Sequence, residues 1–116
     1  MSAPWSGNLR SPLYGGVVLP TLGNPAHATV RTNHRSIAGS PVSGCTGSFS
    51  LWRGVTAVVS GRLMRNPPGD IYALQCPISG EELATRGLYQ WSMTVTISTS
   101  DGKSYKCFET GDFSLP

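Results

Sequence analysis

An uninterrupted alternation of apolar and polar residues near the end of the chain most strongly limits the fold. In GLYQWSMTVTIST, residues 87–99, aromatic and aliphatic side chains occupy every second position, and Gln, Ser and Thr occupy most positions between them. This period of two is typical of a strand with one buried face. Ser-Asp-Gly-Lys at 100–103 has the composition of a tight turn. We therefore predict an antiparallel hairpin that returns from residue 104. The side chains expected to face the core are Tyr89, Trp91, Met93, Val95 and Ile97.

The preceding residues are divided into short segments by glycine and proline, which favours strands and turns over long helices. We predict strands around 48–51, over 55–64 and over 71–75, the last ended by Cys76-Pro77. Ser79-Gly-Glu-Glu82 matches a capping box, so one short helical turn is expected near 80–86, ended by Gly87. Short strands separated by frequent turns predict an all-β fold, an antiparallel β-sandwich or barrel.

The first part of the chain is predicted to be an extended arm. Residues 13–19 and 26–32 could form short strands, whereas 33–47 consists mainly of Ser, Gly, Pro and Asn. A long segment of this composition is typical of a linker or an exposed loop. We therefore expect an extended N-terminal arm and linker over residues 1–43 and a β-sandwich over residues 44–116.

Charge is distributed unevenly along the sequence. Residues 1–69 contain six arginines and no Lys, Asp or Glu, whereas residues 70–116 contain six acids and three cations, for a net charge of +3. This asymmetry suggests either an acidic partner for the first part or head-to-tail contacts between copies of the chain. The alternative is that the arginines only keep a polar arm soluble.

No set of residues matches a catalytic or metal-binding motif. His27 and His34 lie in a region without carboxylates, and the adjacent Glu81 and Glu82 are better explained by the start of a helical turn. The three evenly spaced cysteines form no ligand motif and are expected to be reduced and buried. We therefore expect that the protein is not an enzyme and that it binds neither a cofactor nor a metal ion. The first residues contain no continuous apolar segment, so neither a signal peptide nor a membrane span is expected.

A lone tryptophan among small residues suggests that the arm binds a neighbouring protein. The residues expected to make this contact are Trp5, Arg10, Tyr14, Arg31 and Arg35. Alternatively, Trp5 folds back onto the core of its own domain. Nucleic-acid binding is a further alternative, because dispersed arginines together with Trp5, Tyr14 and Trp52 could combine phosphate contacts with stacking on bases.

The region from Val55 to Leu115 combines short strands, an acidic helical turn, an aromatic-rich strand, an Asp-Gly turn and a last strand that follows a glycine. The residues that carry this pattern are Glu81, Glu82, Gly87, Tyr89, Trp91, Asp101, Gly102, Gly111, Phe113 and Leu115. The pattern resembles the small immunoglobulin-like domain of bacteriophage virion proteins, such as the N-terminal domain of baseplate upper proteins.

This resemblance implies an immunoglobulin-like antiparallel β-sandwich and a structural role in a virion assembled in the host cytoplasm. For a short chain with an arm, the expected role is a capsid cement or decoration subunit. Its partners would be other virion proteins and further copies of itself. A tail, baseplate or fibre-adaptor component is the alternative, and a basic nucleic-acid-binding protein is the second alternative.

Overall fold

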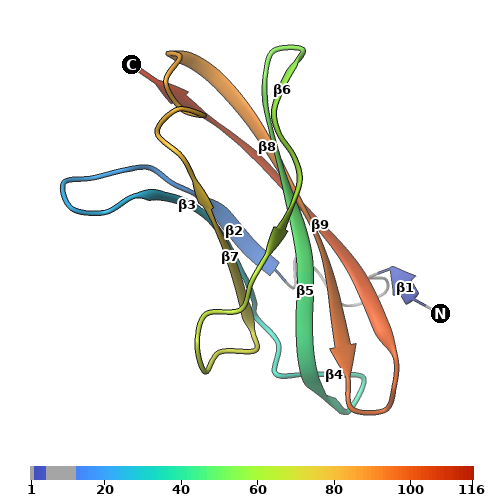
Figure 1. Cartoon of the computed structure of the whole chain (residues 1–116). Coiled ribbons are helices and arrows are strands. Elements are labelled where there is room, and N and C mark those ends of the chain that lie inside the picture. The colour runs from blue at the N-terminus through green and yellow to red at the C-terminus, as the bar shows by residue number, and fades with distance from the viewer. Residues whose placement is uncertain (1, 5–12) are drawn as a thin grey trace.

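Two β-sheets pack face to face in the computed structural model, which describes residues 2–4 and 13–116 (Figure 1). The larger sheet has the strand order β1 (Ser2–Pro4), β9 (Ser104–Leu115), β8 (Gly87–Thr99), β5 (Ser40–Arg53) and β4 (Ser36–Ile37), and β6 (Thr56–Met64) also pairs with β5. The smaller sheet has the order β2 (Leu13–Val18), β3 (Ala26–Thr32) and β7 (Ala73–Ile78). All the elements of the described residues are strands, so this part of the chain has no helix that could cross a membrane.

The hairpin predicted from the alternating sequence is confirmed. β8 pairs with β9 in antiparallel register from Gly87 opposite Leu115 to Ser98 opposite Ser104. The five side chains expected to face the core are at most 7% exposed. In the turn, Gly102 has a φ of 85°, a value that a glycine adopts without the steric cost a side chain would add. The buried face of β8 therefore forms the centre of the core.

The strand order is close to that of a seven-stranded immunoglobulin sandwich, except that the fourth strand, β6, pairs with the third and does not lie beside the fifth. Without the short β1 and β4, seven strands remain in chain order: β2, β3, β5, β6, β7, β8 and β9. The first, second and fifth of these (β2, β3 and β7) form one sheet, and the third, fourth, sixth and seventh (β5, β6, β8 and β9) form the other. Tyr89, near the start of the sixth of these strands, is fully buried, and its hydroxyl donates a 2.5 Å hydrogen bond to the carbonyl of Thr85. This contact is the tyrosine corner of immunoglobulin-like domains. The ring of Tyr89 also stacks on Phe113, with centroids 5.1 Å apart. The predicted fold class is confirmed.

The predicted arm is wrong over residues 13–43, because these residues belong to the sandwich. β3 lies between β2 and β7, in register with β7 from Ala26 opposite Ile78 to Arg31 opposite Ala73. The predicted linker over 33–47 contains β4 and the first half of β5. β5 can form from a Ser- and Gly-rich sequence because its backbone hydrogen bonds to β8 require no apolar side chains. The prediction for residues 1 and 5–12 falls outside the described residues.

Two predicted boundaries in the middle of the chain also change. β7 continues through Pro77 to Ile78, which is possible because β7 is the edge strand of the smaller sheet and needs no outward N–H there. The predicted capping box is present. The N–H of Ser79 donates to Glu82 Oε1 at 2.9 Å, and the N–H of Glu82 donates to Ser79 Oγ at 3.1 Å. It closes a single turn and not a helix, because the chain enters β8 at Gly87.

Glycines allow the two sheets to approach closely at two points. A Cβ atom on Gly47 of β5 would lie 3.0 Å from Leu74 Cδ1, and one on Gly15 of β2 would lie 3.3 Å from Met93 Sδ. Both are shorter than an ordinary contact of about 3.5–4.0 Å between carbon atoms. At these two points a side chain of one sheet, Leu74 or Met93, therefore packs directly against the backbone of a glycine in the other sheet. The remaining core side chains include Phe49, Leu51 and Val95, each at most 1% exposed.

Candidate binding surfaces

The residues expected to bind a partner lie on the folded domain wherever the structure describes them. Trp5 and Arg10 fall outside the described residues. Tyr14 of β2 lies directly opposite Arg31 of β3 on the outer face of the smaller sheet, and Tyr14 is 55% exposed. Arg35 lies in the connection between β3 and β4. The fold thus brings Tyr14 and Arg31 together, with Arg35 four residues beyond Arg31.

Arg31 and Arg35 both contact residues 70–72 of their own chain. Arg31 Nη1 lies 2.5 Å from Asp70 Oδ2, and the guanidinium of Arg35 lies 4.0 Å from the centre of the Tyr72 ring. Asp70 Oδ1 also accepts a 2.9 Å hydrogen bond from the N–H of Tyr72. The hydrogen bond from Arg31 is the main reason why the pKa of Asp70 is lowered. These contacts hold the β6–β7 connection against the end of β3.

A second ion pair joins β6 to the turn after β7. Arg62 Nη1 donates to Glu82 Oε1 at 2.8 Å and to the carbonyl of Pro77 at 2.9 Å, while Nη2 contacts Glu82 Oε2. This bidentate contact lowers the pKa of Glu82 to about 2. Both described ion pairs therefore connect an arginine of the first part of the sequence with an acid of the second. The uneven charge along the sequence is partly balanced within the domain.

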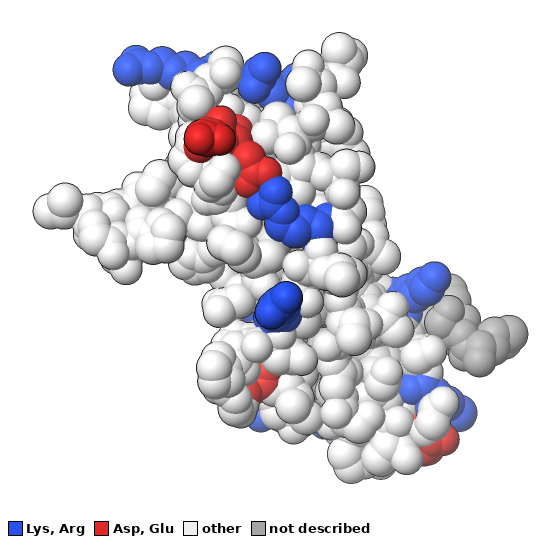
Figure 2. Space-filling model, viewed as in Figure 1, with Lys and Arg blue, Asp and Glu red and all other residues white. Residues whose placement is uncertain are grey.

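The visible charges do not form a continuous basic surface. Figure 2 shows Lys and Arg dispersed over one face of the molecule, with Asp and Glu beside several of them and wide uncharged areas between. A protein that binds nucleic acid through phosphates gathers its cations along one stripe or patch. This arrangement, together with the pairing of Arg31 and Arg62, does not favour the nucleic-acid alternative.

Over β5, β8 and β9 the outer face of the larger sheet carries mainly polar side chains, together with the aromatic rings of Trp52 and Phe108. Cross-strand register places Trp52, Gln90 and Asp112 in one row across β5, β8 and β9. The next row on this face contains Ser50, Ser92 and Thr110, and the row after it contains Ser48, Thr94 and Phe108. Phe108 is 66% exposed, although it lies in the middle of a strand. A single exposed apolar residue is ordinary on a protein surface, but Phe108 shares this polar face with the partly exposed ring of Trp52, and the two together mark a candidate contact surface.

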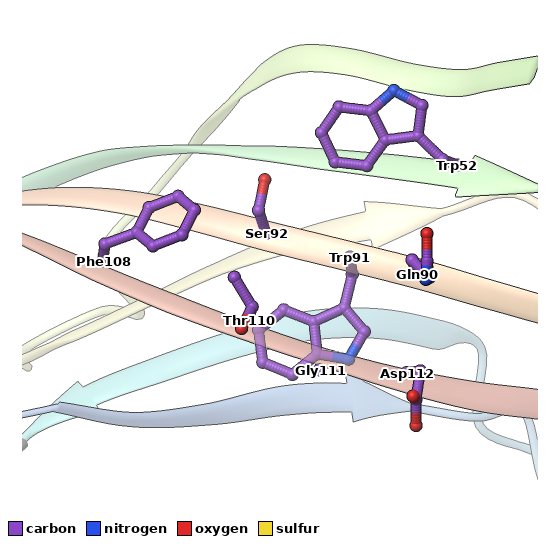
Figure 3. A pocket seen from close by; sticks show the side chains of 8 residues that line it. All are labelled: Trp52, Gln90, Trp91, Ser92, Phe108, Thr110, Gly111 and Asp112. Carbon is purple, nitrogen blue, oxygen red and sulfur yellow. The ribbon is translucent and has the colours of Figure 1, made fainter. Parts of the chain in front are cut away.

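A hollow of about 420 Å³ lies on this face (Figure 3). Its lining residues are Trp52, Gln90, Trp91, Ser92, Phe108, Thr110, Gly111 and Asp112. Figure 3 shows the rings of Trp52 and Phe108 on opposite sides, with Ser92 between them. The volume falls within the range of about 300–1,000 Å³ that is typical of small-molecule sites. Its lining contains one carboxylate and no cation.

Two hairpin ends carry fully exposed aliphatic side chains. Leu22, in the connection between β2 and β3, is 103% exposed, and Val55, between β5 and β6, is 102% exposed. The β2–β3 connection extends beyond the sheets in Figure 1, and the same projection carries no charge in Figure 2. Thr21 and Asn24 on either side of its tip exchange backbone hydrogen bonds of 3.1 and 2.9 Å. Leu22 is therefore presented on an ordered turn.

The cysteines are all free and buried, as predicted. Desolvation raises the pKa of Cys45 to about 11 and that of Cys107 to about 12, so both thiols are protonated at neutral pH. Within the described residues no group of three or more His, Cys, Asp or Glu side chains could hold a metal ion.

No local pattern in the sequence indicates the hollow. Phe108 could have been found, because extending the predicted hairpin register places it on the polar face beside Thr94. Trp52 could not be assigned to the same surface, because its position depends on the pairing of β5 with β8, and its partner Gln90 lies 38 residues later in the sequence. Comparison of the chain with protein-family models, curated proteins and solved structures finds no match.

Proposed function

We propose that this protein is a structural subunit of a bacteriophage virion, held in place by contacts of its folded surface with neighbouring virion proteins. A capsid cement or decoration subunit is the first choice, and a tail, baseplate or fibre-adaptor component is the alternative. The support comes from the sequence resemblance described above, from the immunoglobulin-like sandwich, and from a low content of charged residues, 13% of the chain. A small domain with few charges is suited to close packing among other subunits.

The observation that carries the proposal is the exposed Leu22 at the end of the uncharged β2–β3 projection. A single exposed leucine is ordinary on a protein surface. Here, however, the side chain lies on an ordered turn that projects beyond the sheets, where it can enter a pocket of a neighbour. Complete burial of a leucine side chain contributes roughly 1.5–3 kcal/mol. Many weak contacts of this size are sufficient when each subunit is held at several points in an assembly.

The contact surface proposed here differs from the extended arm that the sequence suggested. Tyr14, Arg31 and Arg35 lie on the sandwich, and both arginines already contact residues of their own domain. The hairpin ends at Leu22 and Val55 replace them as the proposed points of attachment. For Trp5 and Arg10, contact with a partner stays a prediction.

Quantitative protein analysis of purified phage particles tests the proposal. A copy number close to that of the major shell protein supports the decoration subunit, and the low copy number of a ring in the tail supports the alternative. Leu22→Ser should reduce incorporation into particles without changing the thermal stability of the isolated domain, because the side chain makes no core contact. Leu63→Ser is the matched control, since Leu63 is also an exposed leucine, at 77%, but lies within strand β6. Absence of the protein from particles would contradict the proposal.

A further inference from the structure

The hollow on the outer face of the larger sheet points to a ligand that the structural role does not require. We propose that it binds an uncharged carbohydrate chain, with sugar rings stacked on Trp52 and Phe108 and hydroxyl groups bound by the polar side chains that line the hollow. This proposal is independent of attachment through the hairpin ends, because Leu22 and Val55 do not line the hollow.

The two aromatic rings are placed to contact successive parts of one extended ligand. Trp52 and Phe108 lie on the same face, two strands apart and four residues apart along the strand direction. A strand spacing of about 4.8 Å and a rise of about 3.4 Å per residue separate their Cα atoms by roughly 16 Å. One sugar ring is shorter than this span, so the geometry fits an oligosaccharide. The C–H groups on one face of a pyranose ring are apolar and pack against an aromatic face.

The polar side chains that line the hollow are available for hydrogen bonds. The residues concerned are Gln90, Ser92, Thr110 and Asp112. Among the described residues, none of these four side chains has a hydrogen-bond partner, in contrast to Ser50 in the same sheet, whose Oγ accepts the N–H of Gly61. Their amide, hydroxyl and carboxylate groups provide both donors and acceptors. Aromatic faces combined with unpaired polar groups match the mixed apolar and hydroxyl surface of a sugar.

The charge of the lining disfavours other classes of ligand. The one charged side chain is that of Asp112, and no Lys or Arg lines the hollow, so a phosphate or sulfate group would be repelled. Lys106 lies on the same face two residues before Phe108, beyond the lining. An entirely apolar ligand would remove Asp112 from water without offering it a hydrogen bond, which is costly. A neutral sugar can instead donate hydroxyl hydrogens to this carboxylate.

Binding can be tested with the full-length protein on an array of neutral and anionic glycans, followed by fluorescence titration with the neutral oligosaccharide that gives the strongest signal. Trp52→Ala and Phe108→Ala are each expected to weaken binding by roughly tenfold or more, as expected for a lost stacking contact. Asp112→Asn should have a smaller effect, because the amide keeps an acceptor. The matched control is Leu63→Ala, an exposed apolar residue of the same face outside the hollow. Its affinity should be unchanged.

Several outcomes would overturn the inference. One is the absence of binding to any neutral glycan at millimolar concentration. Another is equal loss of binding in the Leu63→Ala control. Self-association of the wild-type protein that is abolished by Trp52→Ala would show instead that this face is an interface between copies. Thermal unfolding of every variant shows whether a loss of binding reflects loss of the fold, and wild-type affinity in a stable Trp52→Ala or Phe108→Ala variant would also contradict the proposal.

Discussion

Replacing Gly111 with alanine tests the packing between β8 and β9 most directly. Gly111 lies opposite Trp91 in the hairpin, and the indole of Trp91 covers its backbone. A Cβ atom at this position would lie 2.5, 2.6 and 2.8 Å from three atoms of the indole ring. These distances are about 1 Å shorter than ordinary contacts between heavy atoms. A flat, rigid ring cannot relieve such overlap by bending, so the whole side chain must shift.

The expected cost follows from the position of this indole in the core. Trp91 is 7% exposed, and its displacement disturbs neighbouring buried side chains. Overfilling a well-packed core usually costs about 1–3 kcal/mol. With an unfolding entropy of about 2.1 cal/mol/K per residue, each kcal/mol lowers the Tm of a domain of this length by about 4 °C. We therefore expect Gly111→Ala to lower the Tm by roughly 4–12 °C, measured by circular dichroism.

A matched substitution separates this clash from the general effect of glycine. Gly16 also lies within a strand, but a Cβ atom there would have no neighbour within 4 Å. Gly16→Ala should therefore leave the stability unchanged or raise it by a few tenths of a kcal/mol, since alanine restricts the unfolded chain. In a Trp91→Leu background the cost of Gly111→Ala should largely disappear. Equal stability of the two alanine variants in the wild-type background would refute the proposed packing of the indole on Gly111.

Three further measurements test the ion pair, the thiols and the core. Glu82→Gln should reduce the free energy of unfolding by about 1 kcal/mol at neutral pH. Because the pKa of Glu82 in the folded protein is about 2, below the usual 4.5, this contribution is complete above the usual value and is lost as the pH falls from 4.5 towards 2. Denaturant titrations of both proteins over that range should therefore converge at low pH, and a constant difference would contradict the ion pair. Cys45 and Cys107, both buried with raised pKa values, should react with a thiol reagent only after denaturant is added, and rapid reaction in the native state would contradict their burial. Leu51→Ala should cost roughly 2–5 kcal/mol in urea unfolding, since Leu51 is 0% exposed, whereas Leu63→Ala, at an exposed position, should cost little.

Local patterns were sufficient to predict the parts of the fold that depend on neighbouring residues. The alternation in 87–99 and the turn at Gly102 predicted the β8–β9 hairpin and its buried side chains. The Ser79–Glu82 capping box was also predicted from spacing alone, because both of its hydrogen bonds join residues three apart. In each case the partners lie close together in the sequence, and the residue types themselves specify the geometry.

Contacts between distant segments were decided only by the tertiary structure. The segment AHATVRT shows little hydrophobicity, and it becomes the central strand of the smaller sheet because β7, more than forty residues later, supplies backbone partners and burial. In the same way, Arg31 seemed free to bind a partner until the fold placed Asp70 beside it. The hollow between Trp52 and Phe108 requires β5, β8 and β9 to lie in one register. The sequence by itself determined which residues alternate and where the chain turns. Which strands become neighbours depends on backbone hydrogen bonds, which nearly every residue type can make, and so only the folded structure revealed the surfaces for which a function is proposed.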